Sequence, residues 1–318
     1  MPKSSILKNG DQGLSIVIPC YQSEASLNEV VLGIRDSIRG TKGFKYEILL
    51  VLDGPTDRTA AIATELENEI AECRVIELSR NFGQHPAIFA GILSAKYEII
   101  ITMDDDGQHL PSEIPTLIKA LNNEIDLIYG IPTEEEHGLF RSFASRFFKT
   151  MLFRILGIKN AKDISAFRIF RKSLLQDIDL HKISSGTVDV ALHWSTSRIK
   201  TVSITMKRRS AGKSNYTLRS LIKFSIQMII GYSVKPLKFA LFIGLVGCLL
   251  SAALSIYFFV QYIQGNVKVA GFSTISILVT TLSSIQLVTL GILGEYIASI
   301  HQKSIGKPMF NIRERSIG

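Results

Sequence analysis

Two long uncharged stretches near the carboxyl end most restrict how this 318-residue chain can fold. They run from Phe239 to Ile263 and from Ala270 to Leu293. Each is longer than the roughly 20 residues that an apolar helix needs to cross a bilayer. A pair of buried core helices is the alternative, but two adjacent uncharged runs joined by a short polar loop favour membrane spans. We therefore predict a hairpin of two transmembrane helices over residues 236–302, with an external loop at 264–271.

Charges on either side of the hairpin predict its orientation. Lys235 and Lys238 precede the first span and Lys303 and Lys307 follow the second, whereas the connecting loop carries Lys268 alone. The positive-inside rule then places both chain ends in the cytosol. The amino-terminal residues lack the apolar core of a signal peptide, so the region before the spans is expected to stay there. These features predict a multi-pass protein of the inner (plasma) membrane.

Apolar strand patterns alternate with helical patterns in the first part of the chain. The strand patterns cover residues 14–20, 46–54, 73–78, 97–103 and 126–130. The helical patterns cover residues 26–40, 58–68, 85–95 and 111–121. Continuous apolar strands separated by helices are typical of a parallel sheet that is covered on both faces. We therefore predict an α/β fold with a Rossmann-like, mostly parallel sheet, in which ligands bind beyond the carboxyl ends of the strands.

Three consecutive carboxylates, Asp104, Asp105 and Asp106, end the fourth predicted strand. Like charges this close repel one another, and a divalent cation is the usual solution. In an extended turn, the spacing of Asp104, Asp106 and Gln108 can bring three oxygens onto one ion. Ligation by oxygen alone indicates Mg²⁺ or Mn²⁺ rather than zinc. The alternative is an acidic turn that caps the following helix.

Two other strand ends carry candidate polar contacts. Asp53 could accept a hydrogen bond from a base or ribose, although aspartate is also a common turn former. Gly83 allows close approach of a ligand to the backbone, and the helix that begins beyond it could face a phosphate. His85 is a candidate contact at this helix start, where a lone histidine is more often structural.

Much of the net charge of +8 lies in two segments, 141–162 and 200–223, where basic and apolar residues are interleaved. Nucleic acid is one partner for a basic surface, but next to two spans an anionic lipid bilayer is the better one, and we predict no nucleic-acid binding. Residues 138–157 and 214–235 are predicted to form amphipathic interface helices, core-packed helices being the alternative. Three cysteines far apart in sequence predict neither a disulfide framework nor a zinc site.

A series of motifs follows one another along the chain. They read IPCYQSE, LDGPTD, RNFGQHPAIFAG, MDDDGQHLP, RSFAS, DISAFRIF, GKSNY and LGEYIASI. This order resembles the polyprenyl-phosphate glycosyltransferases, which are inverting enzymes of the GT-A fold related to dolichol-phosphate mannose synthase. The resemblance extends from about Leu14 to Phe310 and is closest to the bacterial branch that loads glucose or 4-formamido-arabinose onto undecaprenyl phosphate. It implies a cytosolic GT-A catalytic domain over residues 1–213 and a cytosolic tail over 303–318.

The resemblance also implies which residues bind the nucleotide-sugar donor. Asp104 and Asp106 match the outer acids of an Asp-x-Asp motif and Gln108 its following glutamine, which hold Mg²⁺ or Mn²⁺ on the diphosphate of the donor. Tyr21 and Asp53 match positions that contact the nucleotide. The full set of candidate donor-binding residues is Pro19, Tyr21, Glu24, Asp53, Gly83, His85, Asp104 and Asp105.

This chain departs from the family pattern at several nucleotide contacts. It reads Tyr21-Gln22-Ser23 where the family often has Tyr-Asn-Glu, and Leu52 where an acid often precedes Asp53. These changes leave the identity of the base open, with uridine implied by the resemblance alone. Asp105, although it is in the candidate donor-binding set, stands in place of a usually small middle residue of the acidic motif, and the resemblance assigns no particular role to it.

For the polyprenyl-phosphate acceptor, the resemblance implies a second, basic set of residues. The residues implied to bind its phosphate are Arg141, Ser145, Arg208, Arg209 and Lys213. Asp163 begins an Asp-x-x-x-Phe-Arg stretch beside the reaction centre, which ends at Arg168. Asp106, Arg141 and Asp163 are the candidate catalytic residues. An ionised lipid phosphate needs no general base to act as a nucleophile, so the predicted work of these groups is to neutralise and to position charge.

Two other interpretations remain open at this point. A processive polysaccharide synthase of the same fold would carry a Gln-x-x-Arg-Trp motif, but Trp194, the one tryptophan, has no such motif before it. A non-catalytic membrane scaffold would not need the intact acidic and basic residues. The favoured product is a lipid-linked monosaccharide for a cell-envelope glycan or lipid modification, and its sugar, the polyprenol length and a homo-oligomeric state stay open.

Overall fold

The computed structural model describes residues 13–39, 45–133, 164–176, 187–207, 229, 234–264, 271–306 and 308–313. The chain divides into two compact units, of which one combines Met1–Tyr216 with Lys307–Gly318 and the other is Thr217–Gly306. The amphipathic helix predicted at 138–157 lies outside the described residues, as does most of the one predicted at 214–235. These two predictions therefore stay predictions.

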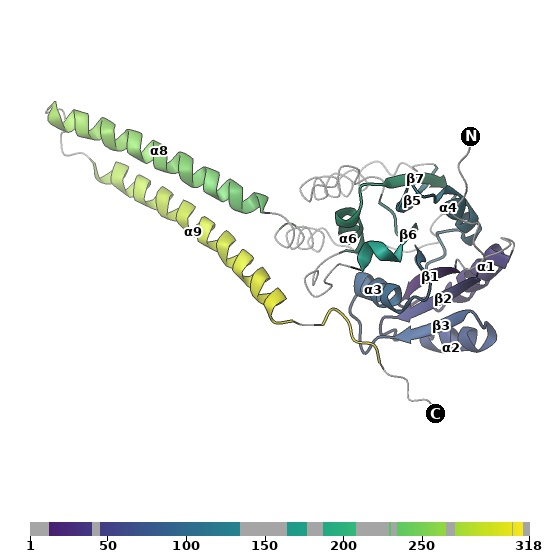
Figure 1. Ribbon diagram of the computed structural model, residues 1–318. Coiled ribbons are helices and arrows are strands. Elements are labelled where there is room, and N and C mark those ends of the chain that lie inside the picture. Colours follow the sequence, from purple (N-terminus) through teal and green to yellow (C-terminus); the bar gives the residue numbers. More distant parts are fainter. Residues whose placement is uncertain are drawn as a thin grey trace. The chain divides into compact units, whose positions relative to one another are not determined.

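A mixed sheet forms the centre of the first unit (Figure 1). Its described strands are β1 (Gly13–Cys20), β2 (Lys45–Leu52), β3 (Cys73–Glu77), β4 (Ile99–Thr102), β5 (Leu127–Pro132), β6 (Arg168–Arg171) and β7 (Ile199–Ile204), in the spatial order β3-β2-β1-β4-β6-β5-β7. Strands β1 to β4 pair in parallel, as do β5 and β7, whereas β6 runs antiparallel between β4 and β5. The predicted α/β fold with a mostly parallel sheet is confirmed.

Helices cover both faces of this sheet (Figure 1). The described helices of the first unit are α1 (Leu27–Arg39), α2 (Thr59–Glu69), α3 (Gln84–Ser94), α4 (Ile114–Ala120) and α6 (Val188–Ser195), with short 3₁₀ turns at η2 (Pro111–Glu113) and η4 (Lys172–Leu175). Helices α1, α2 and α4 lie together, and α3 and α6 pack with each other on the opposite face. The apolar strand runs are continuous because both faces of each central strand are buried.

Strand β1 shows this double burial most clearly. Ile16 and Ile18 join the core cluster that includes Val30 of α1. Val17, between them, faces the other way and lies so close to Gly91 of α3 that any side chain at position 91 would collide with it. The sequence of β1 therefore has no polar face, and glycine lets α3 pack directly on the sheet.

The register of the parallel strands gathers the loops of the candidate site at one edge. Cys20, the last residue of β1, is paired with Leu52 of β2, while Val17 is paired with Thr102 at the end of β4. Strand β4 thus stops short of β1, and the acidic turn that follows it lies beside the last residues of β1. Asp53 directly follows the end of β2, so these polar segments meet without any long excursion of the chain.

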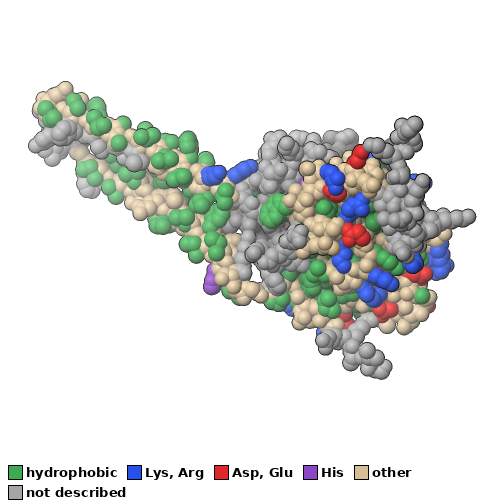
Figure 2. Space-filling model, in the orientation of Figure 1, with side chains coloured by type: hydrophobic (Ala, Val, Ile, Leu, Met, Phe, Trp, Pro, Cys, Tyr) green, Lys and Arg blue, Asp and Glu red, His purple; other side chains and the backbone are tan. Residues whose placement is uncertain are grey.

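Two long helices make up the described part of the second unit, α8 (Lys235–Ile263) and α9 (Phe272–Ser304). Both are long and apolar enough to cross a membrane, with mean hydropathies of 2.2 over Lys235–Leu254 and 1.3 over Thr281–His301. Hydrophobic side chains cover the surfaces of both helices in Figure 2, whereas most of the charged side chains visible there belong to the first unit. An exposed apolar surface of this size fits contact with lipid and not with water.

The segment that follows α9 pairs with the sheet of the first unit. Ile312 forms an antiparallel bridge with Leu78, just beyond the end of β3. Ser79 N donates to Asn311 O at 2.9 Å, and Arg313 N donates to Glu77 O at 2.8 Å. The guanidinium of Arg313 also lies 2.5 Å from the Glu77 carboxylate. Part of the predicted tail therefore covers the outer edge of β3, which would otherwise present unpaired backbone groups.

We expect Arg313→Pro to destabilise the first unit by about 1 kcal/mol, because proline removes the N–H that donates to Glu77. Arg313→Ala keeps that N–H and loses only a half-exposed ion pair, so it should cost less than about 0.5 kcal/mol. Thermal unfolding of the purified full chain in detergent measures both. Equal losses in the two variants would contradict a stabilising backbone pairing at this edge.

Candidate active site

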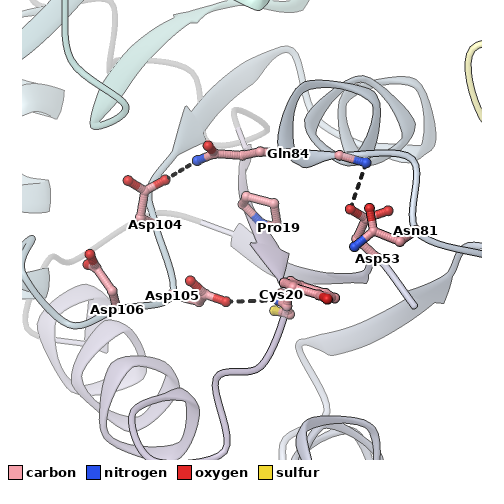
Figure 3. Close-up of a pocket in the computed structure, with 10 residues that line it drawn as sticks. Pro19, Cys20, Asp53, Asn81, Gln84, Asp104, Asp105 and Asp106 are labelled. Atoms are coloured by element: carbon pink, nitrogen blue, oxygen red, sulfur yellow. Dashed lines mark hydrogen bonds between the residues drawn. The ribbon is translucent and has the colours of Figure 1, made fainter. Parts of the chain in front are cut away.

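A cavity of about 360 Å³ opens at the carboxyl ends of β1, β2 and β4 (Figure 3). Its described lining contains the predicted residues Pro19, Tyr21, Asp53, Gly83, Asp104, Asp105 and Asp106. Cys20, Asn81 and Gln84 also line it and were absent from the prediction. Asn81 lies in the loop between β3 and α3, and Gln84 is the first residue of α3. The signal that could have found them was their position between a strand end and a helix.

Asp53 holds this polar loop in place. Its Oδ1 accepts a hydrogen bond from Phe82 N at 2.7 Å and its Oδ2 accepts one from Gly83 N at 2.8 Å. The side chain is buried at 3% exposure, and the two backbone donors satisfy its charge. Asp53 thereby fixes the loop between β3 and α3 against the end of β2, whether or not it also meets a nucleotide.

Two glycines allow the loops to come this close. Gly54, after Asp53, has a φ of +62°, and a Cβ there would lie 2.7 Å from Asn81 N. Gly83 has a φ of +99°, with open space where a side chain would be. An L-residue with a side chain adopts neither conformation without strain. Gly83 therefore exposes its backbone to the cavity immediately before α3 begins, which is where helix amides attract anions.

The two outer acids of the turn lie near the cavity with different partners. Asp104 Oδ1 accepts a hydrogen bond from Gln84 Nε2 at 2.6 Å, as Figure 3 shows. Asp106 Oδ1 accepts one from Gln108 N at 3.0 Å, and the side-chain amide of Gln108 also donates to Asp106. Burial, with a further contribution from Asp106, raises the pKa of Asp104 to about 6, although the positive charge of Arg168 opposes the shift.

The middle acid has a different set of contacts. Asp105 Oδ2 accepts hydrogen bonds from Tyr21 N at 3.0 Å and from the Ser23 hydroxyl. Its backbone oxygen accepts one from Ser26 Oγ at 2.6 Å. Burial raises the pKa of Asp105 to about 6, while the bonds from Ser23 and Tyr21 act in the opposite direction. The contacts of Asp105 are therefore with the loop after β1.

A buried charged network lies behind the acidic turn. Arg168 on β6 forms an ion pair with Asp189 on α6, and its Nε donates to Thr102 Oγ1 at 3.0 Å. The hydroxyl of Tyr129 donates to the same Asp189 carboxylate at 3.1 Å. Burial acts to raise the pKa of Asp189, but the charge of Arg168 outweighs it and the pKa is lowered. Arg168 thus stays cationic at 1% exposure, where its charge also acts on Asp104.

The donor set at the acidic turn fits a divalent cation. Asp104 and Asp106 supply hard oxygen ligands of the kind that Mg²⁺ and Mn²⁺ prefer. Burial and, to a smaller extent, repulsion from Asp106 raise the pKa of Asp104. In the described part of the chain no three His, Cys, Asp or Glu side chains converge on one point. The protein would therefore supply only part of a coordination shell, and water and substrate phosphates supply the rest in such sites.

Three predicted residues lie outside the described lining of the cavity. Glu24 accepts a hydrogen bond from Arg58 N at 3.0 Å, which ties the β1–α1 loop to the start of α2. Gln108 donates to Asp106 as described above. Burial lowers the pKa of His85 to about 4, and its Nδ1 has no hydrogen-bond partner among the described residues. Their predicted roles toward the donor and the metal stay predictions.

The predicted acceptor residues and the predicted catalytic Asp163 are not among the residues that the structure describes. The acceptor residues are Arg141, Ser145, Arg208, Arg209 and Lys213. What the described residues bring together is thus the donor half of the predicted site, with the acidic turn at its centre.

The mixed sheet with its cavity at the strand ends and the two apolar helices place the chain in the GT-A-like class of α/β enzymes. Residues 15–179 match Glycosyl transferase family 2, and residues 235–300 match the GtrB C-terminal hairpin. The chain belongs to glycosyl transferase family 2 and is a glycosyltransferase.

Relatives of similar length cover nearly the whole chain. The undecaprenyl-phosphate 4-deoxy-4-formamido-L-arabinose transferase of Edwardsiella ictaluri is 32% identical, over 95% of this chain and 94% of its own. The dodecaprenyl-phosphate galacturonate synthase of Rhizobium johnstonii is 30% identical, over 95% of this chain and 92% of its own. The predicted resemblance to polyprenyl-phosphate glycosyltransferases is confirmed by these matches.

Solved structures share the fold at low sequence identity. Mannosyl-3-phosphoglycerate synthase from Rubrobacter xylanophilus has a TM-score of 0.51 at 13% identity, covering 70% of this chain and 73% of that one. Glucosyl-3-phosphoglycerate synthase from Mycobacterium tuberculosis, in complex with UDP, has a TM-score of 0.50 at 18% identity, covering 70% and 79%. At these identities the likeness establishes the fold alone.

We expect Asp189→Ala to destabilise the protein by about 3–5 kcal/mol, because it leaves the buried charge of Arg168 without its partner. The double variant Arg168→Met, Asp189→Leu removes both charges and should regain most of that loss. Denaturant unfolding of the full chain in detergent measures the difference. A single variant within about 1 kcal/mol of wild type would show that the pair does not hold β6 to α6.

The raised pKa of Asp104 predicts that metal-free protein loses folding stability in a pH-dependent way. Its folded pKa of about 6 exceeds its ordinary value of 3.8, so the folded state binds the proton more tightly. The folding stability then falls as the pH rises from 3.8 to about 6, and the full loss of stability persists at higher pH. In EDTA, Asp104→Asn should therefore melt about 2–4 °C higher than wild type near pH 7.5, the size of a 1 kcal/mol gain in such a domain.

At about pH 5 that advantage should shrink, because wild-type Asp104 is then mostly protonated. Asp36→Asn, at an exposed carboxylate paired with Arg35 on α1, is the control and should show no such pH trend. An advantage of equal size at both pH values, or a lower melting temperature in Asp104→Asn, would contradict the prediction.

Proposed function

We propose that this protein transfers a sugar from a nucleotide-sugar, with uridine as its base, to undecaprenyl phosphate, in a metal-dependent reaction that inverts the anomeric carbon. The observation that carries the proposal is the placement of Asp104 and Asp106 at one cavity with Tyr21, Asn81 and Gly83. The relatives that act on polyprenyl phosphates support this choice of acceptor. The product is a lipid-linked monosaccharide for the cell envelope.

The cavity offers distinct groups to the two ends of the donor. Its volume of about 360 Å³ falls within the range of small-ligand sites. The exposed ring of Tyr21 and the side chain of Asn81 suit the nucleoside end. The amino-terminal turn of α3, which begins at Gln84, suits the diphosphate, because the first amides of a helix lack helical partners.

The reaction requires charge to be neutralised more than it requires a proton to be moved. An oxygen of the acceptor phosphate bonds to the anomeric carbon as the bond from that carbon to the donor diphosphate breaks, and the diphosphate leaves with the electron pair. The acceptor is already ionised near neutral pH, so no general base is needed. Asp104 and Asp106 would hold a divalent cation here, which would neutralise charge on the leaving diphosphate.

The described residues prepare this centre for that task. Gln84 holds Asp104 by its hydrogen bond of 2.6 Å, and Gln108 holds Asp106 through its backbone and side-chain amides. The charge of Arg168 behind the turn favours the ionised form of Asp104, the form that binds a cation. Each metal-binding carboxylate therefore has a partner that orients it before the donor arrives.

The acceptor side rests on residues beyond the described part of the chain. We assign Arg141 and Ser145 to the lipid phosphate and Arg208, Arg209 and Lys213 to a basic loop over both phosphates. Asp163 orients the sugar or one of these cations. The apolar hairpin of α8 and α9 anchors the enzyme in the plasma membrane with both termini in the cytosol, so that the donor is drawn from the cytosolic pool.

Mass analysis of reaction products tests the proposal. Full-length protein in nanodiscs is incubated with undecaprenyl phosphate, Mg²⁺ or Mn²⁺ and a panel of UDP-, GDP- and dTDP-sugars. The expected result is one lipid-linked monosaccharide whose formation stops in EDTA. A lipid carrying several sugars would instead support a processive synthase, and no product with any donor would support a non-catalytic scaffold.

In the same assay we expect Asp104→Asn and Asp106→Asn each to lower turnover by at least about 100-fold, the scale on which loss of one charge-stabilising group acts. Both variants should remain folded, with unchanged circular dichroism, because each carboxylate is near the surface of the cavity. Asp36→Asn on α1 is the matched control and should keep wild-type turnover. Wild-type turnover in either of the first two variants would overturn the metal assignment.

A further inference from the structure

The carboxylate of Asp105 is turned away from those of its two neighbours, as Figure 3 shows. It points toward the end of β1, where its Oδ2 accepts from Tyr21 N at 3.0 Å and from the Ser23 hydroxyl. Ser26 Oγ donates to the backbone oxygen of the same residue at 2.6 Å. One aspartate in the acidic turn therefore holds the β1–α1 loop at three points.

The part of the loop between two of these points has an unfavourable backbone conformation. Gln22 has a φ of +55°, and it is the one non-glycine residue with positive φ in the described part of the chain. Such a conformation costs about 1–2 kcal/mol for a residue with a side chain, so it persists where its surroundings hold it. Tyr21 and Ser23, on either side of Gln22, both donate to the single Oδ2 of Asp105.

Contacts on the other side complete the restraint of this loop. Ser23 N donates to Thr59 Oγ1 at 2.8 Å, and Gln22 Nε2 donates to Thr56 Oγ1 at 3.0 Å. The loop is thus held between the start of α2 and the acidic turn. Without Asp105 it would keep its contacts to α2 but lose the two that fix its orientation toward the cavity.

What the loop presents to the cavity is Tyr21, which is 47% exposed and lines it together with Asp104 and Asp106. We propose that Asp105 is a positioning residue, which fixes Tyr21 at the nucleoside end of the donor site relative to the cation-binding carboxylates at its diphosphate end. This inference rests on the proposed function. It assigns the middle carboxylate a role that needs neither contact with the cation nor contact with the donor.

The rival role for Asp105 is direct binding of the cation or the diphosphate through its negative charge. The two roles differ in what a neutral isostere can do. Asparagine keeps one acceptor oxygen, which can take both hydrogen bonds that Oδ2 now accepts, but it lacks the charge. Alanine lacks both. If Asp105 acts by positioning, Asp105→Asn should therefore keep most of the nucleotide affinity. If Asp105 acts through its charge, Asp105→Asn should lose most of it.

The test measures binding of UDP and of GDP, each with Mn²⁺, to the full chain in detergent by calorimetry. We expect Asp105→Ala to weaken binding of the nucleotide that wild type prefers by about tenfold, which corresponds to about 1.4 kcal/mol. Asp105→Asn should bind within about threefold of wild type. In the transfer assay, Asp105→Ala should raise the KM for the donor while the KM for undecaprenyl phosphate stays the same.

A double-mutant cycle with Ser23→Ala separates positioning from loss of fold. Ser23 reaches the donor site only through the loop, so Ser23→Ala and Asp105→Ala should be non-additive in nucleotide affinity. Ser195→Ala removes a hydroxyl that donates to Ala191 O on α6 and is the matched control. It should leave nucleotide affinity unchanged. Should Asp105→Ala fail to fold, the Ser23→Ala and Asp105→Asn affinities carry the test alone.

Each outcome decides between the two roles. Two results would overturn the positioning role in favour of a direct role for the charge. One is that Asp105→Asn binds nucleotide as weakly as Asp105→Ala, and the other is that Ser23→Ala and Asp105→Ala have additive effects on nucleotide affinity. Unchanged affinity in Asp105→Ala, or equal increases in both KM values, would overturn it as well. Wild-type protein that binds neither nucleotide would instead count against the proposed function, so the two failures are distinguishable.

Discussion

The parallel pairing of β1 with β2 and β4 is the constraint from which the site follows. This register brings Asp53 and the three carboxylates of the acidic turn to one edge of the sheet. Four acids in one partly enclosed region would repel one another if all faced the same space. Asp53 instead accepts hydrogen bonds from two backbone amides, and Asp105 accepts hydrogen bonds from the β1–α1 loop. Only Asp104 and Asp106 are left for a ligand, so the repulsion that remains is the part that a cation can relieve.

The acids at this edge differ in whether they stabilise the fold or prepare the donor site. The hydrogen bonds that Asp53 and Asp105 accept hold two loops in place, and they add to the order of the fold because each carboxylate has two donors. Asp104 is held by Gln84 yet keeps a raised pKa, so its ionised form is costly in the absence of a cation. The ion pair with Asp189 keeps the positive charge of Arg168 fixed behind the acidic turn. This charge limits the free-energy cost of ionising Asp104. The acidic turn therefore carries an electrostatic cost that a bound cation would relieve.

Local patterns were sufficient to predict the strands that are buried on both faces and the acids that follow them. Strand β6 is four residues long and pairs with residues of β4 that lie more than sixty positions away, and β7 has no continuous apolar run, so neither had a local signal. The role of Asp105 was equally hidden, because its partners Tyr21 and Ser23 are 84 and 82 positions away in sequence. Sequence patterns therefore located the chemical groups, whereas the partners that restrict them depended on tertiary pairing.

The segment that follows α9 pairs with the chain between β3 and the donor site. Asn311, Ile312 and Arg313 pair with Glu77–Ser79. Ser79 is followed by Arg80 and then by Asn81, which lines the cavity, and Asp53 fixes the far end of the same loop through Phe82 and Gly83. The loop is therefore held at its start by the segment that follows α9 and at its end by a carboxylate of the site. Two residues, Ser79 and Arg80, therefore separate the paired Leu78 from Asn81 in the lining of the cavity.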